Sequence, residues 1–203
     1  MLFTLAIEQI FYYNKCMDNQ LLIPNSGQIS LLIAPSVTIA ILMEMTAQMA
    51  MQSRLLVLDG GNRFDGYGLA RALRKRTAAL DAALQNVLLS RVFTCYQMKA
   101  FLSEIDHNSM PLLVLDILAT FLDENVKLPA RQELLANCLV DLQRLSQSAP
   151  VVLWVRKRSL PGIEDEGLLD QVLAASQKTW QFENPGPIAR QMTLFELPGQ
   201  QKY

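Results

Sequence analysis

Residues 28–50 read QISLLIAPSVTIAILMEMTAQMA, and this stretch decides the fold. Its first part, residues 29–34, is apolar except for Ser30, which is typical of a strand buried on both faces. Pro35 and Ser36 then interrupt the run, and residues 39–51 continue as an apolar helix. A buried strand followed at once by a buried helix is the first half of a β-α-β unit. The stretch therefore predicts an α/β fold with a mostly parallel sheet covered by helices.

The same stretch lacks a conventional phosphate loop. That loop has the pattern G-x-x-x-x-G-K-[ST], in which the glycines let the backbone approach the phosphates and the Lys and hydroxyl contact the γ-phosphate and Mg²⁺. If the pattern starts at Ala34, Ile39, Ala40 and Ile41 occupy its second Gly, Lys and Ser/Thr positions, and residues 28–59 contain no glycine. We therefore expect no nucleotide cofactor and no metal here. We also expect these three residues to fill the phosphate space with hydrophobic core.

Composition indicates one folded domain. The chain has 203 residues, 51% of them hydrophobic, and a formal net charge of −1, so no overall basic field attracts nucleic acid. We expect a helical or linker segment at residues 1–27, with a helix over 4–16, and a single domain at 28–203. The three scattered cysteines and one histidine form no zinc pattern. Such scattered thiols are typical of free cysteines in a reducing cytoplasm, so we expect a cytoplasmic protein. Residues 19–43 carry no charge, but Pro24 and Pro35 divide them, so we expect no membrane span.

Further strands and helices alternate along the chain. Strands are predicted at residues 54–58, 91–96, 111–117 and 151–155, and helices at 65–76, 80–89, 97–105, 128–147 and 168–176. Residues 179–183 and 190–197 alternate in polarity, which predicts a C-terminal antiparallel edge. The fold class is a three-layer α/β domain with helices on both faces of the sheet. In such sheets ligands bind beyond the carboxyl ends of the strands.

Several segments, taken in order, are similar to one family. Residues 54–64 resemble a core strand and its D-T-E-G-x-F turn, and residues 91–97 (RVFTCYQ) resemble R-A-[FY]-x-x-x-Q. Residues 112–116 resemble a Walker B strand, residues 131–145 the helix after it, and residues 151–155 the strand that leads into a DNA-facing loop. Together these segments resemble the RecA-like recombinase ATPases, in particular the archaeal and eukaryotic RadA branch and its paralogues, from residue 28 to residue 158.

The departures from that family concern the nucleotide site. The catalytic Glu of D-T-E-G would fall on Gly61, and the γ-phosphate-sensing T-N-Q would fall on residues 154–156, which read WVR. Asp116 keeps the Walker B position, and Asp59, Gly60 and Gly61 keep the place of the turn. One carboxylate without bound phosphates is a poor Mg²⁺ site. The resemblance therefore implies a RecA-like fold that neither binds nor hydrolyses ATP, with these four residues as relics.

The expected function is that of a non-catalytic interaction protein. The resemblance implies an accessory factor in DNA repair, recombination or cell-cycle control that acts through protein contacts. Its partner would be another protein, such as a RecA-like ATPase, or a second copy of this chain. One alternative is an NTPase with an unconventional phosphate site at the Gly60–Gly61 turn.

Two groups of basic residues bear on a second alternative, a DNA-binding module. Arg156, Lys157 and Arg158 follow a predicted buried strand, where three cations could contact a phosphate backbone, although acidic residues 164–166 follow them. Residues 71–76 (RALRKR) form a second basic group at the end of a predicted helix. Solvation and the helix dipole are sufficient to account for that second group. We therefore expect any DNA contact to be weak and to involve residues 156–158.

Overall fold

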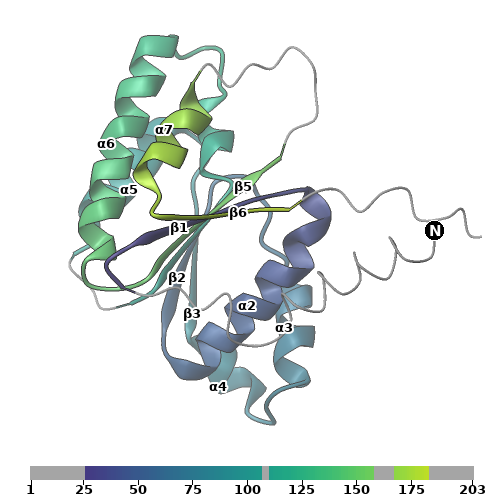
Figure 1. Cartoon of the computed structure of the whole chain (residues 1–203). Coiled ribbons are helices and arrows are strands. Elements are labelled where there is room, and N and C mark those ends of the chain that lie inside the picture. The colour runs from purple at the N-terminus through teal and green to yellow at the C-terminus, as the bar shows by residue number, and fades with distance from the viewer. Residues whose placement is uncertain (1–25, 107–109, 158–166, 183–203) are drawn as a thin grey trace, which may run out of the picture.

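The computed structural model describes residues 26–106, 110–157 and 167–182. Six strands form one parallel sheet in the order β3-β2-β4-β5-β1-β6 (Figure 1). The strands are β1 (Ile29–Ala34), β2 (Leu55–Asp59), β3 (Val87–Arg91), β4 (Leu112–Leu115), β5 (Val151–Arg156) and β6 (Lys178–Gln181). The helices described are α2 (Ile39–Gln52), α3 (Gly66–Arg74), α4 (Leu80–Gln85), α5 (Cys95–Glu104), α6 (Leu128–Ser146) and α7 (Leu168–Ala175), with the 3-10 turns η1 (Ser36–Thr38) and η2 (Ile117–Phe121).

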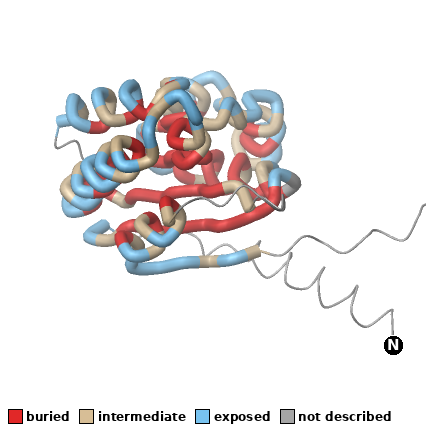
Figure 2. Tube along the Cα trace, turned by 90° about the horizontal axis from the view of Figure 1, so that it is seen from above, coloured by how far each residue is buried: buried red, intermediate tan, exposed pale blue. Residues whose placement is uncertain are grey.

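The sheet separates two hydrophobic cores, as the buried layer in Figure 2 shows. Successive side chains of a strand point to opposite faces. In β5, Leu153 packs in the core with α5, α6 and α7, and Trp154 packs in the core with α2, α3 and α4. Every residue of β1 and β4 is buried, which explains why the central strands have continuous apolar sequences. The expected three-layer arrangement is therefore present.

Helix α2 is a core element. Eight of its 14 residues are buried, including Met43, Met45 and Met49, and only Met51 among its methionines is exposed. Unbranched Met side chains fit irregular gaps between a helix and a twisted sheet. The Met-rich sequence of this helix is therefore explained by packing, without a partner.

The predicted boundaries of the helix and the strand within residues 80–96 were wrong. We expected a helix over 80–89 and a strand over 91–96, whereas α4 ends at Gln85, β3 spans Val87–Arg91 and α5 begins at Cys95. The Thr94 side chain accepts a hydrogen bond from the backbone N–H of Gln97, which starts α5 by N-capping. The helical spacing of residues 80–89 could not reveal that β3 pairs with β2 in parallel register.

The predicted antiparallel edge was also wrong for its first segment. Strand β6 pairs with β1 in parallel, because the crossover through α7 brings the chain back to the same end of the sheet. The second segment, 190–197, and the predicted helix at 4–16 lie outside the described residues. No helix in the described ranges has the length and apolar character needed to cross a membrane.

Candidate functional site at the carboxyl edge of the sheet

The predicted site residues lie at the carboxyl ends of the parallel strands. Across the sheet from β3 to β5, the strands end in Arg91, Asp59, Asp116 (the residue after β4) and Arg156, a row of charges in the order plus, minus, minus, plus. Parallel strands end at the same edge, so four residues far apart in sequence become neighbours. Backbone hydrogen bonds fix this row: the Asp116 N–H donates to the Trp154 carbonyl at 2.7 Å.

The link between β1 and α2 stands where a phosphate loop would be. Only Pro35 and the turn η1 separate the strand from the helix. The Thr38 hydroxyl donates to the Pro35 carbonyl at 2.6 Å, and the Thr38 N–H donates to the same oxygen at 3.0 Å. This hydroxyl is therefore directed back into the link rather than outward toward a ligand.

The expected filling of the phosphate space with hydrophobic core is only partly correct. Ile41 is buried, Ile39 is half-buried, and Ala40 is exposed. The difference arises because the first turn of α2 lies at the rim of the sheet, where one side of a helix faces solvent. Hydrophobic packing thus involves Ile41 and not all three residues.

Asp59 organises the loop that follows β2. Its side chain is fully buried, and its carboxylate accepts hydrogen bonds from the Arg63 N–H at 2.9 and 3.0 Å and from the Phe64 N–H at 2.9 Å. The Arg91 Nε lies 3.6 Å from its Oδ2. Asn62 in this loop has a φ of 52°, a left-handed conformation that Asn tolerates. The role of Asp59 is therefore structural, because its carboxylate oxygens accept hydrogen bonds from backbone N–H groups.

The Gly60–Gly61 turn is packed against β4. A Cβ on Gly61 would lie 2.7 Å from the Asp116 Cβ and 2.9 Å from its Oδ2, so no side chain fits there without a shift. The Gly60 N–H donates to the Leu115 carbonyl at 2.9 Å. With the N–H groups of Gly60, Arg63 and Phe64 bonded internally, three of the donors that an anion would need are already engaged.

Asp116 is held in an uncommon conformation. It is buried, and its φ of 50° and ψ of 56° are left-handed, which is rare for a residue with a side chain. Its Oδ1 accepts a long hydrogen bond of 3.4 Å from the Arg156 N–H, and its Oδ2 lies 3.6 Å from the Arg156 Nε. Asp116 and Arg156, predicted as separate sites, are therefore one ion pair that joins β4 to β5.

This pairing changes the predicted DNA contact. Arg156 is partly buried and its Nε lies beside a carboxylate, while Lys157 is half-buried and its N–H donates to the Ala34 carbonyl at 2.9 Å. Arg158 lies outside the described residues. Arg156, one of the three cations predicted to contact a phosphate backbone, is thus already paired with a carboxylate within the fold.

The structure also shows site residues that the sequence analysis did not select. Arg91 faces Asp59 in the register of β3 and β2, and Arg63 passes beside Gly61, with its Cγ 3.2 Å from the position of a Gly61 Cβ. A correctly placed β3 would have revealed Arg91, because it aligns with Asp59 at the ends of two paired strands. Nothing in the sequence marks Arg63.

Among the described residues, metal-binding groups form no cluster at this edge. In the ranges described, no three or more His, Cys, Asp or Glu side chains are grouped so as to hold a metal ion. Cys95 and Cys138 are buried free thiols on the opposite side of the sheet from α2. Burial raises the pKa of the Cys95 thiol, and burial raises the pKa of Cys138 to about 12, so both stay protonated near neutral pH.

No protein-family model matches this chain, and no curated protein matches it in sequence.

Proposed function

We propose that this protein is a non-catalytic interaction protein with a RecA-like architecture, an accessory factor in DNA repair, recombination or cell-cycle control. The observation that carries the proposal is the short link between β1 and α2. Pro35 and a single 3-10 turn stand in place of a glycine-rich loop, and the Thr38 hydroxyl is bonded back to Pro35. A nucleotide's phosphates need several outward-facing backbone N–H groups and a Lys, and this link supplies no Lys.

The two acidic residues support the same proposal. Mg²⁺ at a nucleotide site is held by carboxylates or hydroxyls together with phosphate oxygens. Asp59 accepts backbone hydrogen bonds from Arg63 and Phe64, and Asp116 lies in an ion pair with Arg156. A carboxylate that is used in this way would have to break internal contacts before it could bind a metal.

The alternatives are weaker for particular reasons. An NTPase with a phosphate site at the Gly60–Gly61 turn would need a side-chain-free space beside that turn, and Asp116 occupies it. A DNA-binding module at residues 156–158 would need Arg156 to leave Asp116. A function through protein contacts requires neither a space beside the Gly60–Gly61 turn nor the separation of Arg156 from Asp116, so we favour that function.

Calorimetric titration with ATP and Mg²⁺ tests the central claim. We expect no heat of binding at millimolar nucleotide and no increase in the unfolding temperature in a parallel thermal-shift assay. Binding at micromolar concentration would refute the proposal. Loss of that binding or of phosphate release in Asp116→Asn would then support the NTPase alternative. In a separate test, a RecA-like ATPase that co-purifies with the protein would support the accessory role.

A further inference from the structure

The outer face of α3 carries an aromatic residue and two arginines in one line. Tyr67, Arg71 and Arg74 are all exposed, and they follow the spacing i, i+4, i+7, which places them on one side of a helix. The opposite side, with Leu69, Ala72 and Leu73, is buried against the core. At about 1.5 Å of rise per residue, the three side chains extend over roughly 10 Å. We call this line of residues the α3 stripe.

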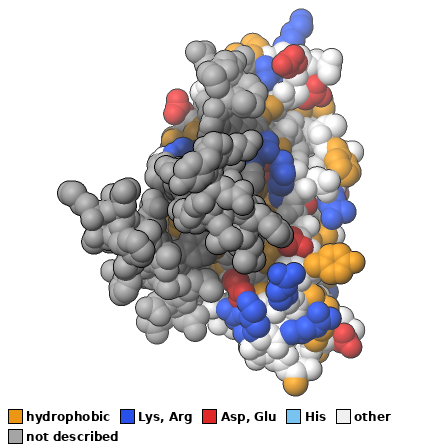
Figure 3. All heavy atoms as spheres, turned by 90° about the vertical axis from the view of Figure 1, so that its right-hand side faces the viewer, with side chains coloured by type: hydrophobic (Ala, Val, Ile, Leu, Met, Phe, Trp, Pro, Cys, Tyr) orange, Lys and Arg blue, Asp and Glu red, His pale blue; other side chains and the backbone are white. Residues whose placement is uncertain are grey.

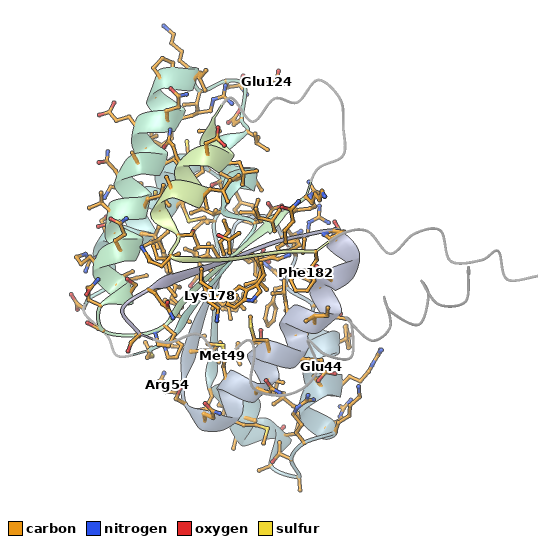
Figure 4. The ribbon with its side chains drawn as sticks, in the orientation of Figure 1. Glu44, Met49, Arg54, Glu124, Lys178 and Phe182 are labelled. Carbon is orange, nitrogen blue, oxygen red and sulfur yellow. The ribbon has the colours of Figure 1, made fainter. Side chains whose placement is uncertain are left out.

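The two arginines of the stripe have no acidic partner within the described residues, unlike the cations around them. Lys75 lies 3.2 Å from Glu44 of α2, and Arg76 pairs with the same carboxylate. Glu44 therefore contacts both basic residues that directly follow α3, and its one negative charge balances one of their two positive charges. Figure 4 shows Glu44 projecting from α2 on the side of α3. The guanidinium groups of Arg71 and Arg74 remain available to solvent.

Tyr67 adds an exposed aromatic ring to this charge. It is 88% exposed, which is more than any other large hydrophobic residue in the described ranges. The helix dipole accounts for cations in the last turn of α3, but it does not account for an aromatic ring in the first turn. Figure 3 looks onto this side of the molecule, where Lys and Arg side chains gather in the lower half beside hydrophobic side chains. Tyr and Arg are the residue types enriched at the energetic centres of protein interfaces.

We propose that the α3 stripe is a docking site for an acidic segment of a partner protein. Arginine pairs with carboxylates through two parallel hydrogen bonds, so Arg71 and Arg74 would bind two acidic side chains about one helical turn apart. Tyr67 would cover an apolar side chain of the same segment. This inference rests on the proposed function in protein contacts, and it adds the surface and the chemistry of the partner.

The charges favour an acidic protein over a nucleic acid. A phosphate backbone is bound through many cations and a positive field over a wide surface. Here the stripe offers two arginines, the exposed Asp65 stands beside Tyr67, and the whole chain has a net charge of −1. Two arginines next to an aromatic ring match a short acidic segment better than a polyanion.

Fluorescence anisotropy with two probes tests the proposal. One is a fluorescein-labelled 15-residue peptide of Glu and Ala with a central Trp, and its control has Gln in place of Glu. The other is a fluorescein-labelled oligothymidine. We expect the Glu peptide to bind, the Gln peptide to bind at least about tenfold more weakly, and the affinity to fall with salt. The variant Arg71→Ala/Arg74→Ala should lose about tenfold or more, and Tyr67→Ala should weaken binding as well.

The control variant is Arg54→Ala. Arg54 is exposed and precedes β2, at the amino end of the sheet, and Figure 4 shows it well away from Glu44. This substitution removes one positive charge, as each of the single substitutions Arg71→Ala and Arg74→Ala does, and it should leave peptide binding unchanged. Equal loss in both variants would indicate a general charge effect and overturn the proposal. Binding of oligothymidine but not of the Glu peptide, or binding of neither, would also overturn it. ATP titration of the same samples separates this failure from failure of the proposed function.

Discussion

The carboxylate of Asp59 should be one of the largest single polar contributions to stability. Removing it in Asp59→Ala leaves the backbone N–H groups of Arg63 and Phe64 without their acceptor beneath the loop. A fully buried donor that loses its partner costs about 1–3 kcal/mol, and these two part-buried donors should each cost an amount near the lower end of that range. Together they give a loss of about 2–3 kcal/mol in the free energy of unfolding. The variant Asp59→Asn keeps one accepting oxygen and should lose less than half of that amount.

The assay is urea unfolding followed by circular dichroism, in which a change of midpoint at constant slope reports stability. Asp65→Ala is the matched control, because the exposed Asp65 accepts a single hydrogen bond, from the Gly68 N–H at 2.9 Å, as an N-cap. Loss of an N-cap costs about 1 kcal/mol. If Asp59→Ala were no more destabilising than Asp65→Ala, Asp59 would not be the residue that holds the loop.

Three further predictions concern the same edge and the core behind it. Gly61→Ala places a Cβ 2.7 Å from the Asp116 Cβ and should destabilise the protein by about 1–3 kcal/mol. Gly66→Ala should not destabilise it, because the nearest atom to its new Cβ would be 3.9 Å away. Thermal unfolding of both variants checks this pair of predictions. Arg156→Ala and Asp116→Asn should each destabilise the protein, and the double variant should lose less than the sum, as a double-mutant cycle measures. The free energy of unfolding should fall as pH rises from about 9 to about 12, because the unfolded chain releases the Cys138 proton near pKa 9.0 and the folded chain keeps it to about 12. Urea unfolding at several pH values should show that Cys138→Ala reduces this dependence on pH. An unchanged dependence would contradict the role given to Cys138.

Features that depend on neighbouring residues in the chain were predictable from the sequence. The strand at residues 29–34 is confirmed at both ends, because a short and mostly apolar run between a glycine turn and a proline has few other conformations. The helix predicted to begin at residue 65 is confirmed, and Asp65 is its N-cap, whose side chain accepts a hydrogen bond from an N–H only three residues away. The missing phosphate loop is likewise a local fact, because the motif requires fixed residues at fixed spacing.

Strand pairing was not predictable in the same way. Residues 80–96 are compatible with helix or strand, and the pairing of Val87 with Leu55 selected the strand four residues earlier than the sequence suggested. The direction of β6 depended on whether the chain returned through α7 to the same end of the sheet, and the polarity pattern of residues 179–183 is the same for parallel and antiparallel edges. In both cases a long-range contact chose between conformations that local propensity left nearly equal.

The candidate site shows the same division. The sequence alone determined the charges of Asp59, Asp116 and Arg156 at the strand ends and the absence of glycines and Lys where phosphates would bind, because these are matters of residue identity. Only the tertiary structure decided which charges are used: Arg156 lies beside Asp116, Lys75 and Arg76 share Glu44, and Arg71 and Arg74 face solvent. An ion pair requires two groups within a few ångströms, and these pairs join residues 31 or more positions apart, so their formation depends on the fold.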